Sequence, residues 1–245
     1  MLTVAIVGAS GGIGAAIVEN LIAHPQVNCI HATYHQSLAA GSIGNVAGFD
    51  SGTQLHLSKL DATDDDQVRS WLASVGKADW IINCVGMLHD GGHTPEKSIN
   101  SFSSEYFEKS MTVNCLPTLL LGKYARAVLK DSPRGVFATI SARVGSISDN
   151  HLGGWYSYRA SKAALNMALK CLSIEWARTS KSIRVAALHP GTTDSRLSKP
   201  FQKNVPEGKL FPPQKTAALL IEQIEQLHER DSGCFIAYDG EDIPW

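Results

Sequence analysis

The chain has 245 residues, of which 44% are apolar and 18% charged, enough to bury one substantial core. Lys and Arg number 22 and Asp and Glu 23, so the net charge of −1 leaves no basic surplus for binding nucleic acid or an anionic membrane. The five cysteines are scattered and form no C-x-x-C pair, which argues against a disulfide framework or a zinc knuckle and favours a reducing cytoplasm. No apolar run approaches the roughly 18 to 20 residues of a membrane span, and Leu2 to Val7 is too short for the core of a signal peptide.

Short β-branched runs alternate with longer segments of helical periodicity, which is the pattern of a parallel α/β sheet. We expect strands at Thr3 to Val7, Val27 to Tyr34, Leu55 to Leu60, Trp80 to Val85, Val136 to Ile140, Ile183 to Leu188 and Cys234 to Tyr238. We expect helices at Gly12 to Ala23, Val68 to Val75 (continuing an acidic first turn at Asp64 to Asp66), Glu105 to Leu129 (kinked or interrupted at Pro117), Trp155 to Arg178 and Thr216 to Glu229. A Gly- and Ser-rich loop joins the second and third strands.

About seven parallel strands with right-handed crossovers predict a Rossmann-type, doubly wound α/β sheet with helices on both faces. We expect a single dinucleotide-binding domain over residues 1–245, with its ligand crevice outside the carboxyl ends of the strands. The segment from Pro190 to Pro213 is polar and has no convincing period, so it is interpreted as a mobile substrate lid. Its side chains indicate neither a charged group that would bind the substrate nor a clear apolar pocket for it.

The first strand runs directly into a glycine-rich turn, and a helix follows. The turn reads Val7-Gly8-Ala9-Ser10-Gly11-Gly12-Ile13-Gly14. Glycines at this place allow a tight turn and a close approach of backbone N–H groups to a phosphate, while the helix N-terminus supplies favourable partial charge. The spacing is G-x-x-x-G-x-G and no Lys-Ser/Thr pair follows, which excludes a Walker A loop. The turn therefore predicts a phosphate-bearing nucleotide.

The end of the second strand usually decides between NAD and NADP, because an acidic residue there binds the ribose hydroxyls and disfavours a 2′-phosphate. This chain has no carboxylate there; it has Tyr34 and His35, whose hydroxyl and imidazole are available to a phosphate. NADP is therefore favoured over NAD. His35 is equally well interpreted as a solvated loop histidine.

Tyr158 and Lys162 lie four residues apart near the start of a predicted helix, so both side chains share one helical face. A nearby cation favours the phenolate, so we expect Lys162 to lower the pKa of Tyr158 from its usual value of about 10. Tyr158 then exchanges a proton with a carbonyl or alcohol oxygen while hydride is transferred. Tyr156 competes for this role, but it is six residues from Lys162 and points elsewhere on the helix.

Together these motifs closely resemble the short-chain dehydrogenase/reductase family over essentially the whole chain. Gly8, Gly12 and Gly14 match its nucleotide turn, Asp61 (followed by Ala62) its adenine contact, and Asn83-Cys84-Val85-Gly86 its N-x-A-G motif, with Val85 replacing the usual Ala. The resemblance implies that Asn114 holds a water in a proton relay, that Tyr158 and Lys162 form the active-site pair, and that Pro190, Gly191 and Thr192 meet the nicotinamide amide. The stretch from Ser141 to Asn166 resembles more narrowly the C-factor and sniffer-type carbonyl reductase branch. The resemblance also implies that the helices at 105–129 and 155–178 form a homodimer or tetramer interface.

One position departs from the family motif of two serines, two further residues and Gly. Here the motif reads Ser141-Ala142-Arg143-Val144-Gly145, so the family's substrate-binding serine is replaced by Ala142. Adjacent side chains on a strand face opposite ways, so Ser141 substitutes only if a bulge redirects it, and Ser146 is a further candidate. We assign the role to Ser141.

The sequence therefore predicts an NADP-dependent reductase that converts an aldehyde or ketone into an alcohol reversibly, with Tyr158 as proton donor. The alternative is a nucleotide-binding, C-factor-like signalling protein with little turnover, which the alanine at Ala142 favours. No metal is expected; His89 and His93 on a glycine-rich loop lack a third ligand nearby in the sequence. The expected partner is a small carbonyl or alcohol compound.

Overall fold

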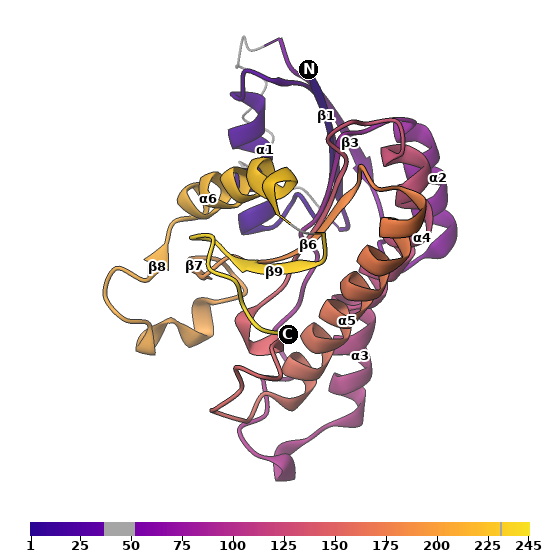
Figure 1. Ribbon diagram of the computed structural model, residues 1–245. Helices are drawn as coiled ribbons and strands as arrows, with labels where there is room; N and C mark the ends of the chain where they lie inside the picture. Colours follow the sequence, from indigo (N-terminus) through magenta and orange to yellow (C-terminus); the bar gives the residue numbers. More distant parts are fainter. Residues whose placement is uncertain (37–51, 231) are drawn as a thin grey trace.

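The computed structural model describes residues 1–36, 52–230 and 232–245, and its centre is a seven-stranded parallel sheet (Figure 1). Its strands are β1 (Leu2–Val7), β2 (Val27–Tyr34), β3 (Gln54–Lys59), β4 (Trp80–Asn83), β5 (Val136–Ile140), β6 (Arg184–His189) and β9 (Cys234–Ala237). They are arranged in the order β3-β2-β1-β4-β5-β6-β9, and every neighbouring pair is parallel. The order reverses between β1 and β4, which is the switch point where open α/β sheets bind ligands. The predicted doubly wound sheet is confirmed.

Side chains on both faces of the sheet are apolar, so both faces must be covered, and helices pack on each. Val4 and Ile6 of β1 pack with α1 (Gly12–Ile22) and α6 (Pro213–Gln226), which lie together on the left in Figure 1. Ala5 and Val7 face the opposite layer, formed by α2 (Asp65–Val75), α4 (Leu116–Leu129) and α5 (Tyr156–Thr179). A fully buried Ile or Leu in such a layer contributes about 1.5 to 3 kcal/mol.

The long helix expected between Glu105 and Leu129 is two helices, α3 (Ser104–Asn114) and α4, which meet at Cys115. Pro117 occupies the first turn of α4, where its missing N–H costs nothing; inside a continuous helix it would break a hydrogen bond and clash with the preceding turn. The predicted interruption is confirmed, and it places Asn114 at the last position of α3.

Other element boundaries differ from the prediction by a few residues. β4 ends at Asn83 rather than Val85, because the Asn83 side-chain oxygen accepts a hydrogen bond from the Val85 N–H at 3.0 Å and turns the chain. Asp64 caps α2 by accepting from the Gln67 N–H at 3.0 Å, as the acidic run predicted. Most of the loop expected between the second and third strands lies within residues 37–51, outside the described residues.

The segment from 190 to 213 contains regular structure that its polar sequence did not indicate. β7 (Thr192–Thr193) and β8 (Leu210–Phe211) form a short parallel pair beside the main sheet, and a 3₁₀ helix spans Lys199–Asn204 between them (Figure 1). Strands of two residues carry too short a pattern to be recognised from sequence. Among the described residues, no helix is both long and apolar enough to cross a membrane.

Candidate active site

A cavity of about 650 Å³ opens at the carboxyl ends of the strands, where the fold places its switch point. Eleven predicted cofactor residues line it: Gly11, Gly12, Ile13, Gly14, Val85, Gly86, Tyr158, Lys162, Pro190, Gly191 and Thr192. Ser141 lines it as well, whereas Gly8, Ser10, Tyr34, His35, Asp61, Ala62, Asn83 and Asn114 do not. The cavity lining therefore brings together residues of the glycine turn, the Tyr158–Lys162 pair and the segment from Pro190 to Thr192. The second group of residues lies outside this lining.

The glycine turn is shaped by close backbone contacts. Gly8 has φ +82°, and a Cβ on Gly14 would lie 2.4 Å from the Gly8 carbonyl oxygen, so neither position accepts a side chain without strain. The N-terminus of α1 has no side-chain cap and no acidic residue in its first turn. Its N–H groups therefore carry uncompensated positive partial charge toward the cavity, which fits a phosphate.

The ends of β2 and β3 continue this turn into an exposed polar corner. The Thr33 carbonyl oxygen accepts from the Ala9 N–H at 2.7 Å, which ties the glycine turn to β2. His35 Nε2 lies 3.7 Å from an Asp61 carboxylate oxygen, and both side chains are exposed. Hydrogen bonds from the Thr63 side chain and backbone, with a smaller contribution from His35, lower the pKa of Asp61. Ionised Asp61 and the imidazole beside it are therefore exposed together at this corner.

Asn83 and Asn114 act on the cavity through the backbone that they hold. Asn83 is fully buried and donates to the Thr118 hydroxyl at 3.1 Å. Asn114 accepts from the Met87 N–H at 2.7 Å and donates to the Met87 carbonyl and the Ser161 hydroxyl. Both asparagines therefore fix the loop after β4, which forms one wall of the cavity.

Tyr158 and Lys162 are 7% and 3% exposed and sit in the cavity wall. Lys162 Nζ donates to the Ile140 carbonyl oxygen at 3.0 Å and lies 5.9 Å from the centre of the Tyr158 ring. Burial lowers the pKa of Lys162 to about 8. Burial, together with the neighbouring Tyr106, raises the pKa of Tyr158 above its ordinary value. The expected lowering of the Tyr158 pKa is therefore wrong for this structure, because desolvation of the phenolate dominates.

The two candidate serines have partners inside the fold. Ser141 is 2% exposed and its hydroxyl donates to Asn166 Oδ1 at 2.6 Å. The Ser146 hydroxyl donates to the Pro244 carbonyl oxygen, which ties it to the C-terminal segment. Ala142 lines the cavity where the family motif has a serine. Of the two residues, Ser141 is part of the cavity lining and Ser146 is not.

The start of α5, which carries Tyr158, is held by a residue that the sequence analysis did not single out. Glu96 is 3% exposed, and its carboxylate accepts from the Ser157 N–H at 3.2 Å and from the Ser157 hydroxyl. Its carbonyl oxygen accepts from the N–H of Trp155, which has left-handed backbone angles (φ 53°, ψ 41°). A carboxylate at a helix N-terminus is favoured by the helix dipole. Nothing in the spacing of Glu96 and Ser157, 61 residues apart, indicates this contact.

A cluster of aromatic rings lines part of the cavity. The centre of the Trp155 ring lies 5.2 Å from that of Phe201 and 6.2 Å from that of Tyr158. The ring centres of His89 and Phe201 are 6.1 Å apart. His89 Nε2 is 3.2 Å from the Arg196 carbonyl oxygen, which links the loop after β4 to the 190–213 segment. Phe201 of this segment and Trp155 both line the cavity, a pairing that the polar sequence of the segment did not indicate.

Comparisons with known proteins agree with this architecture. The profile of the short chain dehydrogenase family matches residues 2–206. The chain is 29% identical, over the full length of both proteins, to 1-hydroxy-2-glutathionyl-2-methyl-3-butene dehydrogenase of Rhodococcus sp. (strain AD45). It is also 31% identical over 137 residues to C-signal of Myxococcus xanthus, covering 56% of this chain and 77% of C-signal.

Two solved structures superpose on essentially the whole chain. Carbonyl reductase Sniffer of D. melanogaster gives a TM-score of 0.86 at 23% identity, with 100% of both chains covered. An NADPH-bound carbonyl reductase from chicken fatty liver gives 0.86 at 25% identity, with 100% of this chain and 99% of the other covered. The resemblance to C-factor and sniffer-type proteins is confirmed, and the chain belongs to the short chain dehydrogenase family.

Proposed function

We propose that this protein is an NADPH-dependent oxidoreductase that reduces an aldehyde or ketone to an alcohol and runs reversibly. The observation that carries the proposal is the buried Tyr158–Lys162 pair in the wall of a cavity that begins at the α1 N-terminus. A deeply buried lysine is costly to maintain, so its presence beside a phenol in a cavity favours a catalytic over a structural role.

NADP is the proposed cofactor. Gly11 to Gly14 would hold its diphosphate at the N-terminus of α1, and Tyr34 and His35 would meet the adenosine 2′-phosphate. Asp61 would contact the adenine, with Ala62 beside it. Pro190, Gly191 and Thr192 would border the nicotinamide, and Val85 and Gly86 the opposite wall. When bound, the cofactor supplies the hydride for reduction and accepts it in the reverse direction. The NADPH found in the carbonyl reductase from chicken fatty liver supports this choice.

The raised pKa of Tyr158 suits it to proton donation during reduction. At neutral pH the phenol stays protonated, so it can give its proton to the carbonyl oxygen as that oxygen gains negative charge. Lys162, with a pKa of about 8, is largely charged at pH 7 and stabilises the phenolate that remains. We assign proton resupply to a water held by Asn114, beside the loop that Asn114 fixes. General catalysis of this kind contributes about 10² to 10⁴ in rate.

The aromatic cluster points to an apolar carbonyl compound, such as an aryl ketone, an aryl aldehyde or a quinone. Trp155 and Phe201 both line the cavity, and an aromatic substituent of the substrate would stack on their rings. Phe201→Ala should raise KM for an aryl aldehyde more than for a short aliphatic aldehyde. An equal effect on both substrates would reject this pocket assignment.

A nucleotide-binding protein with little turnover is the second candidate, favoured by Ala142 and by the hydrogen bond that holds Ser141 against Asn166. The two candidates are separated by measuring NADPH oxidation with aldehydes, ketones and quinones. We expect turnover in the wild type, a loss of about 10² to 10⁴ in Tyr158→Phe, and unchanged NADPH binding in that variant.

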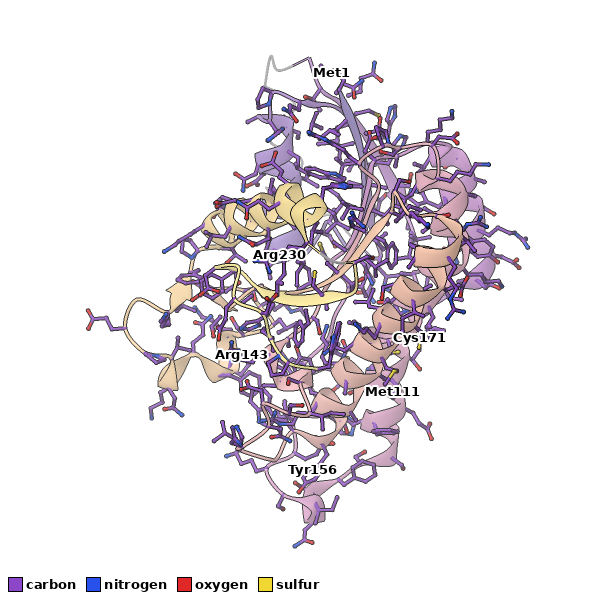
Figure 2. The ribbon with its side chains drawn as sticks, viewed as in Figure 1. Met1, Met111, Arg143, Tyr156, Cys171 and Arg230 are labelled. Carbon is purple, nitrogen blue, oxygen red and sulfur yellow. The ribbon has the colours of Figure 1, made fainter. Side chains whose placement is uncertain are left out.

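Tyr156→Phe is the matched control, because Tyr156 is the first residue of α5 and is 39% exposed (Figure 2). NADPH binding without turnover on any carbonyl compound would support the signalling alternative instead. Equal losses in the Tyr156 and Tyr158 variants would reject Tyr158 as proton donor.

We further propose a homo-oligomer in a reducing cytoplasm. Leu119 on α4 and Met167 and Ile174 on α5 are 47%, 63% and 49% exposed, which leaves apolar surface on the two helices that the family uses for dimerisation. All five cysteines are free thiols, which suits a reducing compartment. A monomeric mass by light scattering at micromolar concentration would contradict the oligomer. The residues 1–245 are proposed to act as one dinucleotide-binding domain, with 190–213 as its substrate lid.

A further inference from the structure

Three side chains with metal-binding chemistry meet at the edge of the sheet that is formed by β2 and β3. Cys29 and His31 lie on one face of β2, and His56 on β3 is paired in register with His31. Their ligand atoms, one sulfur and two imidazole nitrogens, all lie within 4.8 Å of one another. None of the three lines the cavity of the candidate active site. The proposed reductase chemistry therefore does not account for this cluster.

We propose that Cys29, His31 and His56 form a binding site for Zn²⁺. The Cys29 sulfur is 3.5 Å from His31 Nε2. Tetrahedral zinc has Zn–S and Zn–N bonds of about 2.3 and 2.0 to 2.1 Å, which places a sulfur and a nitrogen ligand about 3.5 Å apart. One edge of the coordination tetrahedron is therefore already formed between the two β2 side chains.

His56 completes the set by a small movement of its ring. Its imidazole stacks on that of His31, with ring centres 4.8 Å apart and planes 20° apart. Parallel rings cannot both direct a nitrogen at one ion, so the His56 ring must turn. His56 is exposed on the edge strand β3, where such a rotation meets little packing resistance. Three protein ligands leave the fourth position to a water molecule.

Zinc binding at this site is coupled to the loss of a proton from the Cys29 sulfur. Burial and the facing imidazole of His56 lower the pKa of His31, which keeps His31 neutral and able to coordinate at pH 7. Burial raises the pKa of Cys29, so the thiol carries its proton before the metal binds and its pKa opposes metal binding. Zinc replaces that proton on sulfur, and one H⁺ is released to solvent for each Zn–S bond formed.

The position of the site gives zinc a structural consequence. β3 is an edge strand, and its ladder to β2 is its only pairing within the described sheet. A metal bonded to both strands would clamp this edge. Because β2 and β3 lead to His35 and Asp61, the clamp would also steady the corner that faces the adenosine end of the cavity.

The test is a titration of tag-free, chelator-treated full-length protein with Zn²⁺ against a chromophoric chelator. We expect one Zn²⁺ per chain, a rise in the wild-type Tm with Zn²⁺, and at least about tenfold weaker binding in Cys29→Ser and in His56→Ala. Cys171→Ser is the matched control, because Cys171 is an exposed thiol on α5, away from the β2–β3 edge (Figure 2). His93→Ala is the matched control for the imidazole, because His93 stacks on Tyr106 on a different part of the fold.

Co²⁺ binding provides a second, spectroscopic readout, and the wild-type spectrum does not depend on any variant folding. A thiolate–Co²⁺ charge-transfer band in the near ultraviolet, with tetrahedral bands in the visible, is expected in the wild type and in Cys171→Ser and absent in Cys29→Ser. No Zn²⁺ binding at micromolar concentration overturns the proposal, as does a Co²⁺ spectrum without the thiolate band. Equal losses in the cluster variants and the controls would do so too. NADPH binding and turnover without zinc are measured separately, so neither result depends on the other.

Discussion

The buried charge of Lys162 destabilises the folded protein, and a measurement of stability can detect this effect without any substrate. Burial lowers its pKa from 10.5 to about 8, and each pKa unit corresponds to about 1.4 kcal/mol. Below pH 8 the folded protein therefore carries a penalty of about 3 kcal/mol for holding the lysine charged. Because the folded-state pKa is lower than the unfolded-state value, the unfolded chain binds more protons between pH 8 and 10.5. Stability from this group therefore rises with pH in that window.

The substitution Lys162→Met removes this pH dependence. The lost hydrogen bond to the Ile140 carbonyl costs stability at every pH, so the informative quantity is the change with pH and not the value at one pH. Between pH 7 and 9.5 we expect the free energy of unfolding of the wild type to rise by about 2 kcal/mol relative to Lys162→Met.

Urea unfolding across this pH range measures the difference directly. Lys181→Met is the matched control, because Lys181 is exposed and its removal should leave the pH curve parallel to that of the wild type. Parallel curves for the wild type and Lys162→Met would show that Lys162 does not titrate abnormally. The argument that Lys162 is a destabilising charge kept in the cavity wall for its function would then be wrong.

Substitutions at three further residues, Glu96, Gly14 and Gly11, test how the site is positioned. Glu96→Ala should destabilise the fold by about 1 to 3 kcal/mol and lower turnover by misplacing Tyr158. Glu96→Gln should recover part of the stability. Equal Tm values for the wild type and both Glu96 variants would contradict this capping role. Gly14→Ala should destabilise the fold by about 1 to 3 kcal/mol, because its methyl group would lie 2.4 Å from the Gly8 oxygen. Gly11→Ala, whose methyl group would lie 3.9 Å from that oxygen, should keep its Tm and lose NADPH affinity; unchanged fluorescence titrations with NADPH would place the phosphate elsewhere.

The sheet and the gathering of the site could be predicted because their signals are local. Most strands are short runs rich in apolar residues, and the turn that ends at Gly14 and the pair at Tyr158 and Lys162 are each contained in eight residues or fewer. A parallel sheet then places the carboxyl ends of its strands at one edge, so these motifs converge without further information. The break before Pro117 was equally predictable, since the effect of proline on a helix depends only on its neighbours.

The remaining features depend on contacts between distant parts of the chain. The Glu96–Ser157 contact and the Trp155–Phe201 pair join residues 61 and 46 positions apart, and no spacing rule relates them. The pKa of Tyr158 depends on how completely the fold removes water from the phenol, which the spacing to Lys162 does not report.

The role proposed for Ser141 depends on the orientation of the side-chain amide of Asn166. Asn166 is buried, its Oδ1 accepts the Ser141 proton, and its Nδ2 has no hydrogen-bond partner within the described part of the chain. An unpaired buried donor costs about 1 to 3 kcal/mol. Turning the amide over exchanges two groups of nearly equal shape. Nδ2 then donates to the Ser141 oxygen, and the hydroxyl proton becomes free to face the cavity that Ser141 lines.

The amide therefore decides whether Ser141 can donate to a substrate carbonyl. Asn166→Asp replaces the donor with a second acceptor, which keeps the Ser141 proton turned away from the cavity. We expect this variant to lose turnover as Ser141→Ala does, by about 10² to 10³, with NADPH affinity unchanged in both. If both variants keep the wild-type kcat, no hydroxyl at this position assists the carbonyl, and proton donation by Tyr158 must account for the chemistry alone.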